Sequence, residues 1–214
     1  MKKSKSSPIS FSFIISSALI CVLFLTHCVS CTPVQSLNLQ RLIDSTPYGQ
    51  PIVIPDGTYF LDTGLEVTDR SDITISARNE ARILVRDVYA NVIGFTDCGS
   101  VRLSNLYLAH AVPLDEYECH GSVVYARDCE SIRVSNCDLN GCGAIGLSVW
   151  SCGSVMVSET RIEDNSFNAL YVHGLKELII TESIIQNNGN LMQIHECREI
   201  EMHGNLIRNN GGYW

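Results

Sequence analysis

Apolar residues recur at a nearly constant spacing through the C-terminal half of the chain. Four eight-residue segments fall into register when they are aligned, and each has apolar residues at its first, third and eighth positions. The segments begin at Ile132, Val155, Leu178 and Ile200. Alternation over so few residues is typical of short β-strands and not of helices.

A second apolar pair precedes each segment by eight and six residues. These pairs are Val124 and Ala126, Leu147 and Val149, Leu170 and Val172, and Met192 and Ile194. A unit of about 22 residues with three short strands cannot bury its inward side chains alone, so neighbouring units must stack in parallel, ~4.8 Å apart. The leucine-rich repeat has a similar period, but its Leu-x-x-Leu-x-Leu-x-x-Asn signature is absent. The pattern therefore predicts an all-β fold, a parallel β-helix solenoid of about seven coils.

The same register extends toward the N-terminus, where Val101, Ile73 and Ile52 begin further units. The larger spacings there indicate insertions. The longest lies at about residues 109–118, which are polar, contain a proline and are expected to form a surface loop.

A short amphipathic helix is predicted before the first unit, within residues 36–45. Leu39, Leu42 and Ile43 fall on one face of it. Such a helix would cover the open end of the solenoid, which otherwise presents unpaired strand edges. We therefore expect a linker and capping helix in residues 31–50 and the β-helix domain in residues 51–214.

The first thirty residues have the three parts of a secretory signal: lysines near the start, an apolar stretch to about residue 26, and then short residues. We expect residues 1–30 to be a signal peptide, with an uncleaved signal anchor as the alternative. The run Cys28-Val29-Ser30-Cys31 resembles a bacterial lipobox, which implies lipidation at Cys31, although Cys28 stands where leucine is usual. Lipidation or plain cleavage both predict export, to the cell envelope or the medium, with membrane contact only through the lipid.

Composition narrows the function classes. The chain of 214 residues carries a formal charge of −8, and its three N-terminal lysines account for part of the positive charge. An acidic body is a poor match for nucleic-acid backbones, so no nucleic acid is expected as a partner. No nucleotide-binding loop, serine-hydrolase elbow or zinc-ligand helix occurs in the sequence, so we expect no cofactor.

Equivalent positions of a solenoid stack into columns, and one column is rich in cysteine. It contains Cys98, Cys129, Cys152, Leu175 and Cys197, small or apolar residues that favour an inward stack near a turn. A metal site is not expected there, because a line of thiols is not a tetrahedron and no C-x-x-C pair is present outside the N-terminal segment.

A second turn column holds Cys119, Cys142, Asn165, Asn188 and Asn210. Stacked asparagines at a turn can form an amide ladder. Cys119 and Cys142 would lie ~5 Å apart, which permits a disulfide although parallel side chains make the torsion awkward. Outside the N-terminal segment the chain has an odd number of cysteines, so at least one is free or pairs with another molecule.

Two outward columns carry the side chains that are most suited to a ligand. One holds Arg127, Trp150, His173 and His195, and the other holds Tyr125 and Tyr171. Aromatic faces suit sugar rings and the polar tips suit hydroxyl groups. The residues 109–118, together with His120, could form one wall of a groove beside them. The alternative is an ordinary sheet surface, where Tyr and Trp are favoured in any case.

Two stretches resemble the right-handed parallel β-helix (pectin lyase-like) superfamily. They are Pro51-Ile-Val-Ile-Pro-Asp-Gly-Thr-Tyr59 and the repeat Ser-Ile-Arg-Val-Ser-Asn-Cys-Asp-Leu-Asn-Gly-Cys-Gly at 131–143 with its successors. The resemblance spans about residues 36–212 and implies the fold. It does not fix an activity, because that superfamily includes lyases, hydrolases, epimerases and non-catalytic members.

Catalytic residues of that superfamily do not carry over. The Asp-Asp, Gly-His-Gly and Arg-x-Lys segments of polygalacturonase-like members are absent. The acidic column of Asp97, Asp128 and Glu196 is interrupted by Ser151 and Gly174, unlike the clustered Asp that holds Ca²⁺ in pectate-lyase-like members. The weak catalytic candidates that remain are Glu159, Asp164, Glu182, His173 and His195.

Three functions stay open at this point. The first is an exported, lipid-anchored protein that binds carbohydrate or another surface polymer without cleaving it. The second is a small polysaccharide lyase or glycoside hydrolase. The third is a structural or adhesive surface protein that docks a partner or another copy through an open C-terminal end.

Overall fold

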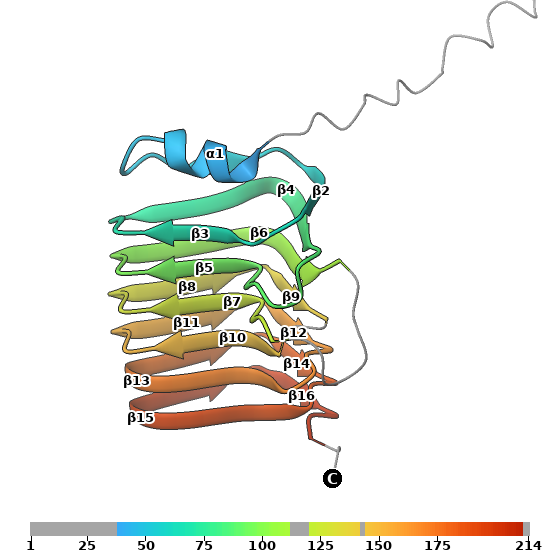
Figure 1. Cartoon of the computed structure of the whole chain (residues 1–214). Coiled ribbons are helices and arrows are strands. Elements are labelled where there is room, and N and C mark those ends of the chain that lie inside the picture. Colours follow the sequence, from blue (N-terminus) through green and yellow to red (C-terminus); the bar gives the residue numbers. More distant parts are fainter. Residues whose placement is uncertain (1–37, 112–119, 142–143, 212–214) are drawn as a thin grey trace, which may run out of the picture. The chain divides into compact units, whose positions relative to one another are not determined.

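The computed structural model describes residues 38–111, 120–141 and 144–211, which form a parallel β-helix preceded by one short α-helix (Figure 1). Every strand pair in these ranges is parallel. The predicted all-β solenoid is thereby confirmed. The expected signal peptide, Cys31, the Cys119–Cys142 pair, most of the insertion at 109–118 and the last three residues lie outside the described ranges.

The strands stack on three faces. The first face consists of β1 (Ile52–Ile54), β8 (Ser131–Ser135), β11 (Ser154–Ser158) and one part each of β4 (Ile73–Val85), β6 (Ser100–His110), β13 (Asn168–Thr181) and β15 (Asn190–His203). The second face consists of β2 (Gly57–Leu61), the remainder of β4 and β6, β9 (Asp138–Asn140), β12 (Arg161–Glu163), β14 (Ile184–Gln186) and β16 (Leu206–Arg208). The third face consists of β3 (Leu65–Thr68), β5 (Ile93–Thr96), β7 (Val124–Arg127), β10 (Ile145–Trp150) and the first parts of β13 and β15.

Long strands join the faces into one sheet of sixteen strands within the described ranges. β4 and β6 pass from the first face to the second, and β13 and β15 pass from the third to the first. The solenoid therefore makes about six full turns and part of another, close to the expected seven.

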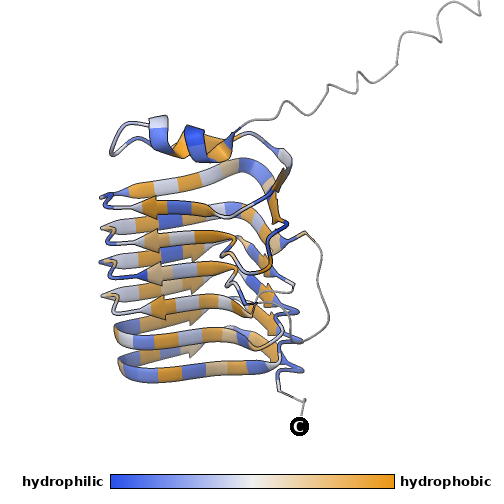
Figure 2. Ribbon diagram, in the orientation of Figure 1, coloured by the Kyte–Doolittle hydropathy of each residue, from blue (hydrophilic) through white to orange (hydrophobic). Residues whose placement is uncertain are grey.

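The core is a set of single files of apolar side chains. Val134, Val157, Ile180 and Met202 are register partners on successive turns, as the periodicity predicts. Along most strands, buried apolar residues alternate with outward residues that are mainly polar (Figure 2). Because an inward residue in one turn lies ~4.8 Å above its equivalent in the next, each file excludes water up to the last described turn.

Most corners between faces begin with a residue of positive φ. These residues are Asn105, Asn136, Glu159, Glu182 and Gly204 after the first face, Gly141, Asp164, Asn187 and Asn209 after the second, and Asp69, Asp97, Asp128, Ser151, Gly174 and Glu196 after the third. Asn, Asp and Gly tolerate this conformation best, which explains much of the composition of the corners.

At two corners the described residues that follow the left-handed positions form hydrogen-bonded ladders with their equivalents on neighbouring turns. The predicted amide ladder is confirmed for Asn165, Asn188 and Asn210, whose side chains bond one another at 2.8 Å. A hydroxyl ladder at another corner was not predicted from the sequence. Thr160 Oγ1 accepts a hydrogen bond from the N–H of Cys137 in the preceding turn, and Ser183 Oγ accepts one from the N–H of Thr160 at 3.2 Å.

Helix α1 (Leu39–Ser45) covers the first turn and is shorter than the predicted range (Figure 1). Asn38 is the N-cap of the helix: its side chain accepts a hydrogen bond from the N–H of Arg41. Leu39 and Ile43 are buried in the core cluster, as expected of a capping helix.

The buried Arg70 holds this helix in place. It occupies the position equivalent to Cys98, at the end of the cysteine column. Its guanidinium donates to the carbonyl oxygens of Ile43 at 2.6 Å and Thr46 at 2.9 Å, at the helix C-terminus, where carbonyl oxygens lack the N–H partners of a continuing helix.

The last described turn is open. Leu178 and Ile185 are fully buried, whereas their register partners Ile200 and Ile207 are 47% and 41% exposed. Self-association through this end stays a prediction.

One expectation about the insertion is wrong. Ala109 and His110 belong to strand β6 and are buried, because the strand continues through the corner onto the second face, where Ala109 is the register partner of Asn140. His110 Nε2 lies 2.9 Å from the carbonyl oxygen of Ala90, so this side chain does not form an outer groove wall. His120 instead stacks on Tyr89, with ring centroids 5.0 Å apart.

Among the helices that the structure describes, none has the length and apolar character required to cross a bilayer.

Candidate functional site

Four rings form a continuous stack on the third face. Trp150 of β10 and His173 of β13 are register partners, as are His173 and His195 of β15. The Trp150 ring lies 4.8 Å from the Tyr171 ring and 5.3 Å from the His173 ring, measured between centroids. His195 follows at 5.8 Å from Tyr171 and 6.1 Å from His173. The outward columns predicted from the sequence are therefore confirmed as a ring row that crosses three turns.

The row is anchored by a contact that the sequence did not suggest. Trp150 Nε1 donates to Ser148 Oγ at 3.1 Å, so the indole lies back along its own strand. Ser148 is buried although alternation places it on the outer face. The small serine leaves room for the indole, which fixes the ring before any ligand arrives.

Because the rings stack on one another, only part of each ring surface is accessible to a ligand. Trp150 is inclined by 30° to Tyr171 and 25° to His173, so the rings cover parts of one another's faces. The row presents ring edges, the polar tips of Tyr171 and the two histidines, and the side of Trp150 that faces the preceding turn. These groups can contact the apolar patches and hydroxyls of a sugar.

Tyr125 and Arg127 lie in the same columns one turn earlier, in register with Ser148 and Trp150. The Arg127 guanidinium forms an exposed ion pair with Asp128 at 3.4 Å. Among the ring contacts of the described residues, none involves Tyr125. The structure thus places both residues beside the row but not in the stack.

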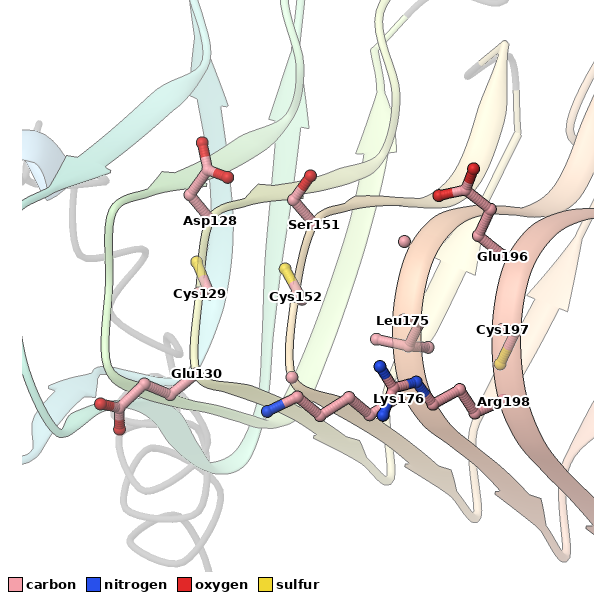
Figure 3. A pocket seen from close by; sticks show the side chains of 12 residues that line it. Asp128, Cys129, Glu130, Ser151, Cys152, Leu175, Lys176, Glu196, Cys197 and Arg198 are labelled. Carbon is pink, nitrogen blue, oxygen red and sulfur yellow. The ribbon is translucent and has the colours of Figure 1, made fainter.

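A groove of about 960 Å³ runs along the corner next to the ring row (Figure 3). Cys129, Cys152, Leu175 and Cys197 form its floor. Asp128, Ser151, Gly174 and Glu196 form the wall next to the rings, and Glu130, Gly153, Lys176 and Arg198 form the opposite wall. Sequence reasoning missed this groove, although the three columns that form it directly follow the ring column in the repeat.

The carboxylates considered as catalytic candidates lie elsewhere. Glu159 and Glu182 are exposed at the corner between the first and second faces, where they line a hollow of about 180 Å³ with Asp138 and Arg161. Asp164 is exposed at the next corner. Throughout the described ranges, none of these three carboxylates makes a hydrogen bond or ion pair with His173 or His195.

A polar network on the second face also escaped the sequence reasoning. Arg161 pairs with Asp138 at 3.1 Å and lies 3.8 Å from Glu163. The Glu163 carboxylate accepts hydrogen bonds from Asn140 and Gln186. Burial raises the pKa of the Asp138 carboxyl, and Arg161 partly opposes the effect.

No group of three or more His, Cys, Asp or Glu side chains in the described ranges is arranged to hold a metal ion.

Comparison with known proteins gives a family and a fold. The family model described as "Right handed beta helix region" matches residues 91–213. A search of the curated proteins finds no match. A crystal structure described as that of "a putative glycosyl hydrolase from Parabacteroides merdae" is similar to this chain with a TM-score of 0.62 and 12% identity, over 77% of this chain and 84% of that one. ORF18 of Geobacillus virus E2 is similar with a TM-score of 0.56 and 14% identity, over 80% of this chain and 36% of that one. At such identities the similarity shows the fold alone.

Proposed function

This chain belongs to the right-handed β-helix family, and from that premise we propose that it binds carbohydrate on its third face without cleaving it. The stack of Trp150, Tyr171, His173 and His195 carries the proposal. Rings that are already packed against one another lose little conformational freedom when a ligand binds, which favours affinity. The proposal includes export with lipid attachment at Cys31, since a surface polymer is met outside the cell.

The adjoining groove supports a polymer as the ligand. A single sugar would contact one or two rings, whereas the row crosses three turns and continues into a groove with both carboxylates and cations on its walls. Polar groups along such a path can pair with many hydroxyls in turn. The similarity to a structure described as a glycosyl hydrolase agrees with a ligand of this class.

Cleavage of a glycan is the second candidate, and the hollow beside Asp138 is the observation that favours it. Carboxylates that flank a bond are the usual catalysts of glycoside hydrolysis, and burial raises the pKa of Asp138 in the direction that suits a general acid. Incubation with xylan and pectate, followed by assays for reducing ends and unsaturated products, decides between binding and cleavage. Product formation above a blank would contradict the binding proposal.

Trp150→Ala tests the ring row. We expect the dissociation constant for a retained polysaccharide to rise about tenfold, a loss of ~1.4 kcal/mol, because the largest ring and its contacts with Tyr171 and His173 disappear. The measurement is affinity electrophoresis in gels that contain hydroxyethyl cellulose, xylan or pectate.

Phe60→Ala is the matched control, because Phe60 is an exposed ring of β2 on the second face. Its retention should equal that of the unchanged protein. Equal retention of the folded Trp150→Ala variant, or no retention of the unchanged protein in any of these gels, would remove the proposed binding face.

A further inference from the structure

Three thiols stand in single file on successive turns, and two of them lie beneath the groove. Cys98, Cys129 and Cys152 follow the third face on successive turns, and each is 3% or 4% exposed. Each thiol donates to the carbonyl oxygen two residues before it, at 3.3 Å from Cys98 and Cys129 and 3.4 Å from Cys152. Because the three side chains share one conformation, their sulfur atoms are separated by about the strand spacing of ~4.8 Å.

The file is interrupted beyond Cys152. Leu175 occupies the next turn, and the Cys197 thiol contacts the carbonyl oxygen of Glu199, two residues after it and not before. Cys137, at a different corner, has the same local geometry as the three thiols, with its sulfur 3.3 Å from the carbonyl oxygen of Ser135. Its neighbours on the adjacent turns, however, are Leu106 and Thr160.

The spacing of the file suits a two-coordinate metal ion. Soft ions such as Cu⁺ and Ag⁺ prefer thiolates. Two metal–sulfur bonds of ~2.3 Å laid end to end span ~4.6 Å, close to the strand spacing. A linear site of this kind needs only two donors, so the rigid stacking of parallel strands, which prevents a tetrahedral site, provides the required geometry.

The groove selects one pair of the three thiols. Cys129 and Cys152 line it, and Cys98 does not. An ion that enters from the groove therefore meets the Cys129–Cys152 pair first.

We propose that Cys129 and Cys152 together hold one soft, two-coordinate metal ion of the Cu⁺ and Ag⁺ class, which enters from the groove. As each metal–sulfur bond forms, the proton of that thiol passes to solvent. No electron is transferred, so neither an oxidant nor a reductant is required.

The test uses Ag⁺ with the full, reduced chain, compared with Cys129→Ser, Cys152→Ser and Cys137→Ser. The dissociation constant is measured by competition with dithiothreitol. Loss of either member of the pair should weaken the tightest Ag⁺ site at least tenfold, whereas Cys137→Ser, which removes a buried thiol without a thiol neighbour, should leave it unchanged. Equal effects of all three substitutions would overturn the proposal, because they would mean that each thiol binds silver independently.

Two measurements on the unchanged protein apply even where a serine variant fails to fold. With one equivalent of Ag⁺, X-ray absorption should show two sulfur neighbours at a single distance. Alkylation followed by peptide mass measurement, with and without silver, should find that silver lowers the labelling of Cys129 and Cys152 and leaves that of the equally buried Cys137 unchanged. Three sulfur neighbours, or protection that does not favour this pair, would refute the site.

Discussion

Replacing Asn188 with alanine will lower the free energy of unfolding by roughly 3–5 kcal/mol, because this buried side chain forms hydrogen bonds with residues of three turns. Its Nδ2 donates to the carbonyl oxygens of Ile162 and Gln186 and to Asn210 Oδ1. Its Oδ1 accepts from the backbone N–H and the side-chain amide of Asn165. Alanine leaves these buried partners unsatisfied, and water does not reach the 2% exposed position to replace the lost bonds.

Urea denaturation followed by circular dichroism measures this loss. Asn190→Ala is the control, since Asn190 Nδ2 makes one hydrogen bond, to the carbonyl oxygen of Phe167, in an exposed setting. The free energy of unfolding of the control should fall by less than about 1 kcal/mol. Asn188→Asp keeps the shape but places a buried carboxylate against the carbonyl oxygens of Ile162 and Gln186, and should lose at least as much stability as the alanine variant. If the alanine variant were as stable as the control, the amide ladder would contribute nothing to the fold.

Arg70→Ala should release the capping helix and lower stability by about 3–4 kcal/mol, because hydrogen bonds from a charged donor to buried acceptors are the strong ones. The guanidinium holds the carbonyl oxygens of Ile43 and Thr46, and it lies 4.8 Å from the centre of the Tyr48 ring. Without it, the C-terminal end of α1 loses its attachment, and the hydrogen bonds of Gln40 to the backbone of Glu66 remain as a polar contact of the helix with the first turn.

Hydrogen exchange locates this effect. Amides of α1 and β3 should lose protection in Arg70→Ala, while those of β11 and β13 keep theirs, because a solenoid turn contacts only its neighbours. Arg70→Lys should recover part of the protection, because the lysine ammonium is still a charged donor but lacks the fork of the guanidinium. Arg41→Ala, on the same helix but exposed, serves as the reference. Uniform loss of protection along the chain would contradict a local role for Arg70.

The sequence predicted the register of the core because stacking converts a one-dimensional repeat into contacts. Once Ile132, Val155 and Leu178 are recognised as equivalent, every other position of the unit acquires its neighbours at ~4.8 Å. For the same reason the columns of Trp150 with His173 and of Asn165 with Asn188 followed without any structure.

Other features depend on how side chains fill space around the corners. The repeat placed Ser148 outward, but only the rotamer of Trp150 decides that the indole covers it. Likewise, Arg70 occupies a cysteine position of the repeat, and its role became apparent only when α1 was seen to place two carbonyl oxygens within its reach.

The amino-acid sequence by itself determined the solenoid, its files of inward residues and the rows of outward ones, because periodic alternation leaves a single way to bury the apolar set. Only the tertiary structure decided how the rings of Trp150, Tyr171 and His173 lean on one another, that a groove lies beside them, and that Cys129 and Cys152 share one orientation. Those features arise from rotamers and from the bend between faces, which depend on packing in three dimensions and leave no periodic trace along the chain.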